Sequence, residues 1–88
     1  MMTDTDLMDA ILLSRESMKL VQTGANVFKA LEQVATKQDL LGGEALKTVY
    51  RDVQEMNSTD SDAEPGQGAL SAVISSLTRE AKRRKLIK

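Results

Sequence analysis

The sequence predicts a small all-α protein, and three observations carry this prediction. Apolar residues recur at helical spacing in several segments, whereas no segment sustains the alternation of polar and apolar residues that a half-buried strand shows. Aromatic residues make up only 2% of the chain, so its core must consist of aliphatic side chains, which suit helix seams better than sheets. A chain of 88 residues has room for one modest core, and self-association or a partner would relieve its marginal stability.

The first predicted helix begins near residues 4–6, where capping and acidic side chains suit a helix amino terminus. From residue 7 to residue 35, steps of four and three residues mark out nine positions, and only Ser14 and Glu32 among them are not apolar. This 3.5-residue repeat is typical of a coiled-coil seam, so we expect a long N-terminal helix that self-associates. The seven residues assigned to that self-association are Leu7, Ile11, Met18, Val21, Ala25, Phe28 and Ala35.

A helical hairpin is the alternative to this long helix. Gly24 is a residue type that commonly ends a helix, and Asn26 is one that commonly caps the start of the next. A glycine inside a helix costs only about 1 kcal/mol relative to alanine, so the pattern leaves both a continuous helix and a hairpin broken near Gly24 open.

Two shorter amphipathic helices are expected further along the chain. Gly42 and Gly43 predict a turn, because adjacent glycines end a helix readily. The helix after them carries a one-sided apolar stripe of Leu46, Val49, Tyr50, Val53 and Met56. Residues 57–68 are rich in Asn, Ser, Asp, Pro and Gly, which predicts a flexible acidic linker between a helical body, 1–56, and a last amphipathic helix with a basic tail, 69–88.

The charge of the chain is unevenly distributed. The net charge is −1, but residues 79–88 hold six basic residues against Glu80, a net +5, which leaves −6 for the rest. The contiguous cations favour an anionic partner. Helix dipoles also attract cations to a last turn, so a solvated basic end with no partner is the alternative interpretation of the same residues.

The last helix and its tail form the candidate binding site. Its apolar stripe either packs against the other helices or is presented to a partner, and an apolar pair beside the cations favours docking into a protein groove. We expect a protein partner to contact Leu70, Val73, Ile74, Leu77, Arg79, Lys82, Arg83, Arg84, Lys85, Leu86 and Ile87, with the last two exposed on a free tail.

These features predict a non-enzymatic assembly or adaptor protein that self-associates and docks its basic C-terminal helix onto a protein partner. The alternative is a small nucleic-acid-associated regulator that binds the phosphate backbone through residues 79–88. Direct base recognition has little support, because no aromatic side chain lies near the cluster for stacking.

Catalysis, cofactors and metals are not expected. The chain has no histidine or cysteine, which removes the commonest acid–base and nucleophilic groups, and nothing marks a small-molecule substrate site. Asp60, Asp62 and Glu64 match the start of a calcium-binding loop, but Pro65 replaces its glycine and Ser71 its closing glutamate. An acidic amino terminus and the lack of a long apolar run predict an intracellular, soluble protein, cytoplasmic or, in a eukaryote, nuclear, with no membrane association.

Overall fold

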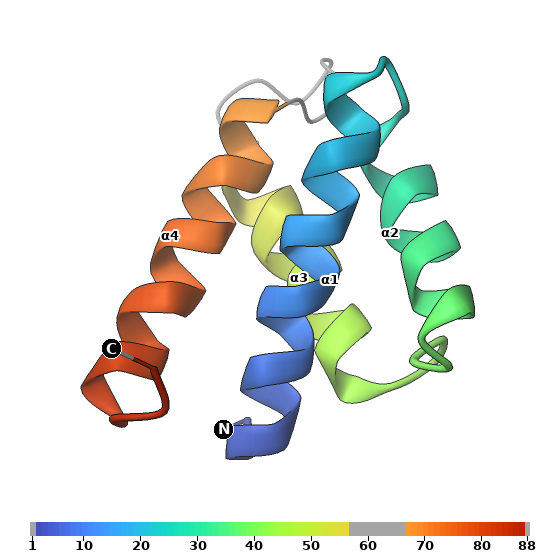
Figure 1. The fold of residues 1–88 in the computed structure, drawn as a ribbon. Helices are drawn as coiled ribbons and strands as arrows, with labels where there is room; N and C mark the ends of the chain where they lie inside the picture. The colour runs from blue at the N-terminus through green and yellow to red at the C-terminus, as the bar shows by residue number, and fades with distance from the viewer. Residues whose placement is uncertain (1, 57–66, 88) are drawn as a thin grey trace.

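The computed structural model describes residues 2–56 and 67–87, and within these ranges the chain forms four α-helices and no strand (Figure 1). The helices are α1 (Asp4–Gln22), α2 (Val27–Lys37), α3 (Glu44–Met56) and α4 (Gln67–Arg83). The predicted all-α fold is therefore confirmed. The acidic positions Asp60, Asp62 and Glu64 lie outside the described residues.

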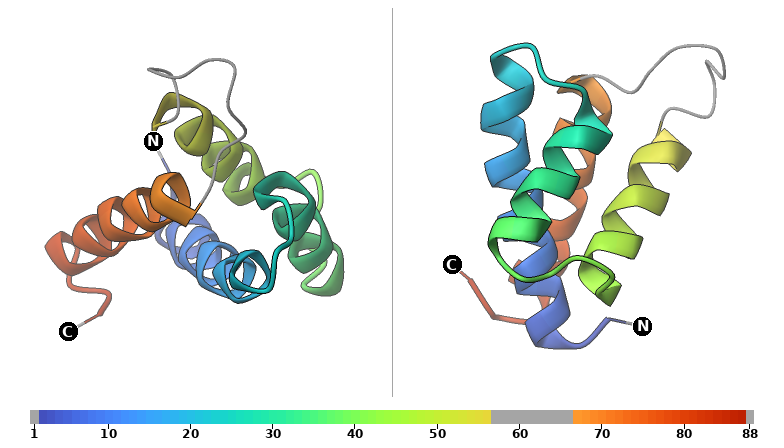
Figure 2. Two further views of the ribbon diagram at one scale, coloured as in Figure 1. Left: turned by 90° about the horizontal axis from the view of Figure 1, so that it is seen from above. Right: turned by 90° about the vertical axis from the view of Figure 1, so that its right-hand side faces the viewer.

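Helix α1 is the centre of the bundle. It contacts each of the other three helices, and α3 also packs against α4 and α2. Seen from above, α4 and α2 lie on either side of α1, and α3 closes the third side (Figure 2). Because α4 runs antiparallel to α1, the first turn of α1 and the last turn of α4 lie at the same end of the molecule (Figure 1).

The chain turns sharply between α1 and α2, so the hairpin is correct and the continuous helix is wrong. Gly24 adopts a φ of +104°, and the amides of Gly24 and Ala25 donate to the carbonyls of Val21 and Leu20 at 3.0 and 3.1 Å, which is a Schellman motif. The Asn26 side chain then accepts from the amides of Phe28 and Lys29 and caps α2. A positive φ is the reason that glycine is needed here.

The residues assigned to a self-association seam belong to the core of a single chain. Leu7, Ile11, Val21 and Ala35 are buried, and Met18, Ala25 and Phe28 are partly buried against them. The apolar residues keep a helical spacing on both sides of the turn because α1 and α2 each bury one face in the same core. Self-association stays a prediction, but these side chains do not form an exposed seam.

Helix α3 follows the predicted glycine turn. Gly42 has a φ of +81°, and a Cβ on Gly43 would lie 3.1 Å from the carbonyl oxygen of Leu40. On the predicted stripe, Leu46, Val49 and Val53 are buried and Tyr50 is half-buried, whereas Met56 is 49% exposed. The rings of Phe28 and Tyr50, the two aromatic residues of the chain, meet edge to face with centroids 5.4 Å apart.

Helix α4 begins at Gln67, inside the segment interpreted as linker, and packs onto α1 and α3. Its stripe residues Leu70, Val73 and Leu77 are buried, with exposed fractions of 0%, 0% and 6%. The expectation that a partner contacts these three side chains is therefore wrong for the folded bundle, because the core already covers them. Of the stripe, only Ile74 is partly exposed.

Candidate binding site on the fourth helix

The basic cluster at the end of α4 is divided between paired and unpaired side chains. Glu80 accepts from Arg83 Nε at 2.9 Å and from Arg84 Nε at 3.0 Å. The hydrogen bonds from Arg83 and then Arg84 hold the pKa of Glu80 below its ordinary value. These pairs have the i, i+3 and i, i+4 spacing of helical ion pairs, so the sequence contained the signal that two of the cations are neutralised.

Arg84 also connects the two ends of the chain. Its Nη1 atom donates to the carbonyl of Met2 at 2.8 Å and to Oδ1 of Asp4 at 3.1 Å. The Arg84 side chain is only 20% exposed as a result. It therefore stabilises the bundle and is poorly placed to bind a partner.

The residues after α4 do not form a free apolar tail. Lys85 has a φ of +63°, and the amide of Leu86 donates to the carbonyl of Ala81 at 2.9 Å, which ends the helix in a Schellman motif. Leu86 and Ile87 are partly buried against the core. The expectation that both would be exposed is wrong, because this turn folds the chain back onto the bundle.

Three cations of the cluster remain available. Arg79, Lys82 and Lys85 are exposed, and none makes an ion pair with another described residue. Lys82 follows Glu80 by two positions, and because a helix turns about 100° per residue, the two side chains leave opposite sides of α4. Lys82 is thus separated from the acidic residue that pairs with Arg83 and Arg84.

A groove of about 310 Å³ lies along this side of α4. It is lined by Ile74, Ser75, Thr78, Arg79 and Lys82. The lining combines two hydroxyls and two cations with one apolar side chain, and it contains no carboxylate. Its polar groups are all able to donate hydrogen bonds to an anion.

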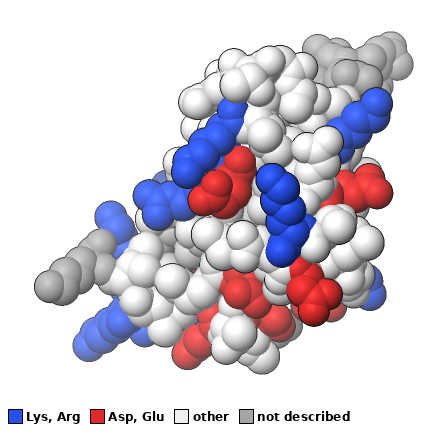
Figure 3. Space-filling view, turned by 45° about the vertical axis from the view of Figure 1, so that its right-hand side comes forward, with Lys and Arg blue, Asp and Glu red and all other residues white. Residues whose placement is uncertain are grey.

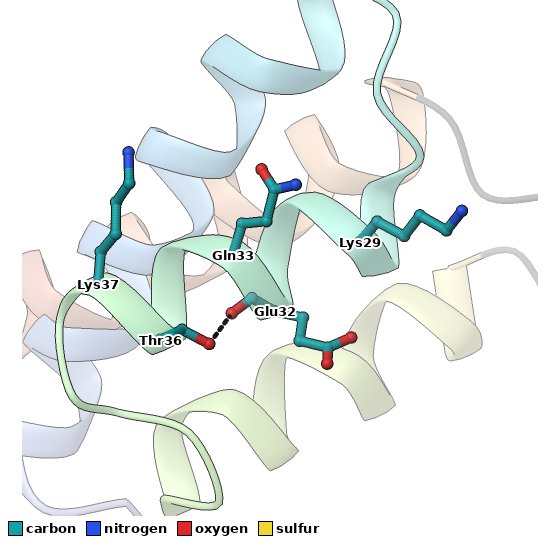
Figure 4. A pocket seen from close by; sticks show the side chains of 5 residues that line it. All are labelled: Lys29, Glu32, Gln33, Thr36 and Lys37. Atoms are coloured by element: carbon teal, nitrogen blue, oxygen red, sulfur yellow. Dashed lines mark hydrogen bonds between the residues drawn. The ribbon is translucent and has the colours of Figure 1, made fainter.

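Two other grooves differ in that each includes a carboxylate. A groove of about 470 Å³ on α2 is lined by Lys29, Glu32, Gln33, Thr36 and Lys37. Figure 4 shows Glu32 extending on the side of α3, while Gln33 and Lys37 extend on the other side of α2, and Thr36 donates to the Glu32 carbonyl at 2.9 Å. The second, of about 190 Å³ between α1 and α2, includes Glu16 and Lys19.

Mixed charge is the rule elsewhere on the visible surface. The view in Figure 3 shows acidic and basic side chains interspersed, without a broad field of one sign. A strongly basic surface of the kind that wraps nucleic acid is not present on this face.

The described residues contain neither a cluster of metal ligands nor a membrane-spanning helix. Residues 2–56 and 67–87 hold no group of three or more acidic side chains close enough to bind a metal ion. Within the same ranges, no helix is long and apolar enough to cross a membrane. Comparison with protein-family models, curated proteins and solved structures finds no match to this chain.

Proposed function

We propose that this protein is a non-enzymatic adaptor that docks onto an acidic surface of a protein partner through Arg79, Lys82 and Lys85. The observation that carries the proposal is that these three exposed cations form no ion pair within the described residues, while Arg83 and Arg84 next to them are paired with Glu80. Unpaired cations can contact an anionic surface without first breaking an ion pair within their own chain.

A protein partner is favoured over nucleic acid for two reasons. Three phosphate contacts give only weak binding, because affinity for nucleic acid grows with the number of neutralised phosphates. The groove beside the cations also includes Ile74, an apolar side chain that suits contact with a protein.

Capture from an extract of the source cells tests this proposal when it is followed by reconstitution. The full-length chain serves as bait beside a triple variant, Arg79→Glu, Lys82→Glu and Lys85→Glu, and a control, Lys29→Glu with Lys37→Glu on α2. A captured protein is then purified and its affinity for each bait is measured by calorimetry. We expect the triple variant to lose at least tenfold in affinity and the control to keep the wild-type value.

Two outcomes contradict the proposal. Equal affinity of the triple variant and wild type would show that the cations of α4 are not the docking site. Capture of nucleic acid instead of protein, with an affinity that falls steeply between about 50 and 200 mM salt, would favour the phosphate-backbone alternative. Circular dichroism of each variant checks that the helices are intact.

Self-association is the second part of the proposal. With the seam residues in the core, it would have to use exposed apolar side chains, of which Met8 and Leu12 are four positions apart on α1 and 37% and 40% exposed. Light scattering coupled to size exclusion, over a tenfold concentration range, tests it. A defined oligomer supports self-association, and a concentration-independent monomer refutes it.

A further inference from the structure

We propose that the groove on α4 binds a phosphomonoester group, such as phosphoserine or phosphothreonine, carried by the protein partner. This inference rests on the proposed function, because it names the chemical group that the docking surface recognises. Its starting point is the arrangement of the four polar lining residues, Ser75, Thr78, Arg79 and Lys82.

These four residues occupy positions i, i+3, i+4 and i+7 of one helix. That spacing places them at the corners of a single surface hole, the same unit that accepts a side chain in helix packing. Neighbouring corners have Cβ atoms about 5–6 Å apart, so long side chains at two corners can reach one ligand group above the hole. Two hydroxyls, a guanidinium and an ammonium group therefore border one hole.

Charge selects the ligand among anions. A phosphomonoester carries about −1.5 to −2 charges near pH 7 and offers three acceptor oxygens, whereas a carboxylate or a phosphodiester carries only one charge. The two cations at the hole, Arg79 and Lys82, match the dianion. Ile74, at the edge of the groove, adds an apolar contact for the peptide around the phosphoryl group, which free phosphate cannot use.

The α2 helix provides an internal control with the same spacing of lining residues. Lys29, Glu32, Gln33 and Thr36 also stand at i, i+3, i+4 and i+7, but one corner is a carboxylate. Glu32 would repel a dianion at that position. Of these two holes in the described part of the chain, the one on α4 has no carboxylate among its four corner residues and the one on α2 has Glu32.

Amide chemical shifts of the full-length, ¹⁵N-labelled chain test the inference. The probes are a capped heptapeptide of alanines with a central phosphoserine, the same peptide with glutamate, inorganic phosphate, and a thymidine tetranucleotide without terminal phosphates. We expect the phosphopeptide to shift amides around residues 74–82 and not those around Lys29. The glutamate peptide and inorganic phosphate should each bind the wild type at least fivefold more weakly than the phosphopeptide does. The phosphopeptide should also bind the Lys82→Gln variant at least fivefold more weakly than the wild type, whereas Lys29→Gln should leave its affinity unchanged.

Each other outcome has a defined meaning. Glutamate and phosphoserine peptides of equal affinity would overturn the phosphoryl inference and leave the proposed docking of an acidic partner intact. If inorganic phosphate bound as tightly as the phosphopeptide, recognition of a peptide would be overturned. If the tetranucleotide bound more tightly than the phosphopeptide, the proposal of a protein partner would be overturned. Shifts at the α2 hole equal to those on α4 would show that the carboxylate-free hole has no selectivity.

Discussion

Arg84 and Asp4 stand 80 positions apart in the chain, yet the guanidinium Nη1 lies 3.1 Å from a carboxylate oxygen of Asp4. The same guanidinium donates to Glu80 through Nε and to the Met2 carbonyl. One side chain thus ties the last turn of α4 to the first turn of α1, the two elements that close the bundle at this end.

The ion pairs of Glu80 with Arg83 and Arg84 predict a loss of stability in acid. Because Arg83 and Arg84 lower the pKa of Glu80 in the folded chain, Glu80 contributes stability that is fully present above its ordinary value of 4.5 and is lost as the pH falls through the depressed folded pKa. Glu80→Gln should therefore have a lower Tm than wild type near pH 7, and the difference should become smaller as the pH is lowered toward 2. Thermal unfolding followed by circular dichroism measures both.

Glu16→Gln is the matched control for this prediction. Glu16 makes only an exposed pair with Lys19 at 3.4 Å, so its replacement should change the Tm little at either pH. A Glu80→Gln variant whose Tm difference is the same at both pH values would contradict the role assigned to the Glu80 charge.

Local signals in the sequence predicted the helices well. Gly24 and Asn26 indicated a helix end and the next cap, and Gly42 and Gly43 indicated the following turn. The competing heptad pattern suggested a longer helix because apolar spacing alone does not reveal whether a seam faces another chain or the rest of its own. The turn at Gly24, which packs α2 back against α1, decided between them.

The candidate site was only partly predictable, and the reason is long-range packing. The i, i+3 and i, i+4 spacing of Glu80 from Arg83 and Arg84 could have been recognised beforehand. The contact of Arg84 with Asp4 could not, because no local pattern pairs residues at opposite ends of a chain. The burial of Leu70, Val73 and Leu77 likewise depends on where α4 docks.

Opposite substitutions in two Schellman motifs should have opposite effects on stability. Gly24→Ala introduces a side chain at a φ of +104° and should cost about 1 kcal/mol or more. Lys85→Gly removes a side chain at a φ of +63° and should gain about 0.5–1 kcal/mol, after the larger entropy of the unfolded glycine is subtracted. Urea unfolding of each variant gives these free energies, and a destabilised Lys85→Gly would mean that Lys85 makes contacts that outweigh its backbone strain.

Replacing the buried Ser17 should increase the stability of the fold. It is 0% exposed, and its hydroxyl has no hydrogen-bond partner in the described structure. Ser17→Ala keeps nearly the same volume, removes the unsatisfied hydroxyl and raises helix propensity, so it should stabilise the fold by about 1 kcal/mol.

Ser14→Ala provides the comparison for Ser17. Ser14 is equally buried, but its hydroxyl donates to the Ala10 carbonyl at 2.8 Å, so its removal should gain less. The two variants are compared by urea unfolding at the same pH. A loss of stability in Ser17→Ala would indicate that the hydroxyl is hydrogen-bonded in solution.

Tyr50 gives a direct optical measure of the packing between α2 and α3, because it is the chain's one tyrosine. Desolvation is the larger cause and the negative charge of Glu32 the smaller cause of a pKa raised above the ordinary value of 10.0. Glu32→Gln should therefore lower the pKa of Tyr50 only in part, as measured by phenolate absorbance. The neutral ring is favoured in the fold, so its contribution is fully present below pH 10 and is lost as the pH rises through the raised value. If Glu32→Gln instead brought the Tyr50 pKa fully to 10.0, the charge of Glu32 and not burial would be the main cause of the raised pKa. The pKa of Tyr50 would then no longer support close packing of α3 on α2 at the Phe28 contact.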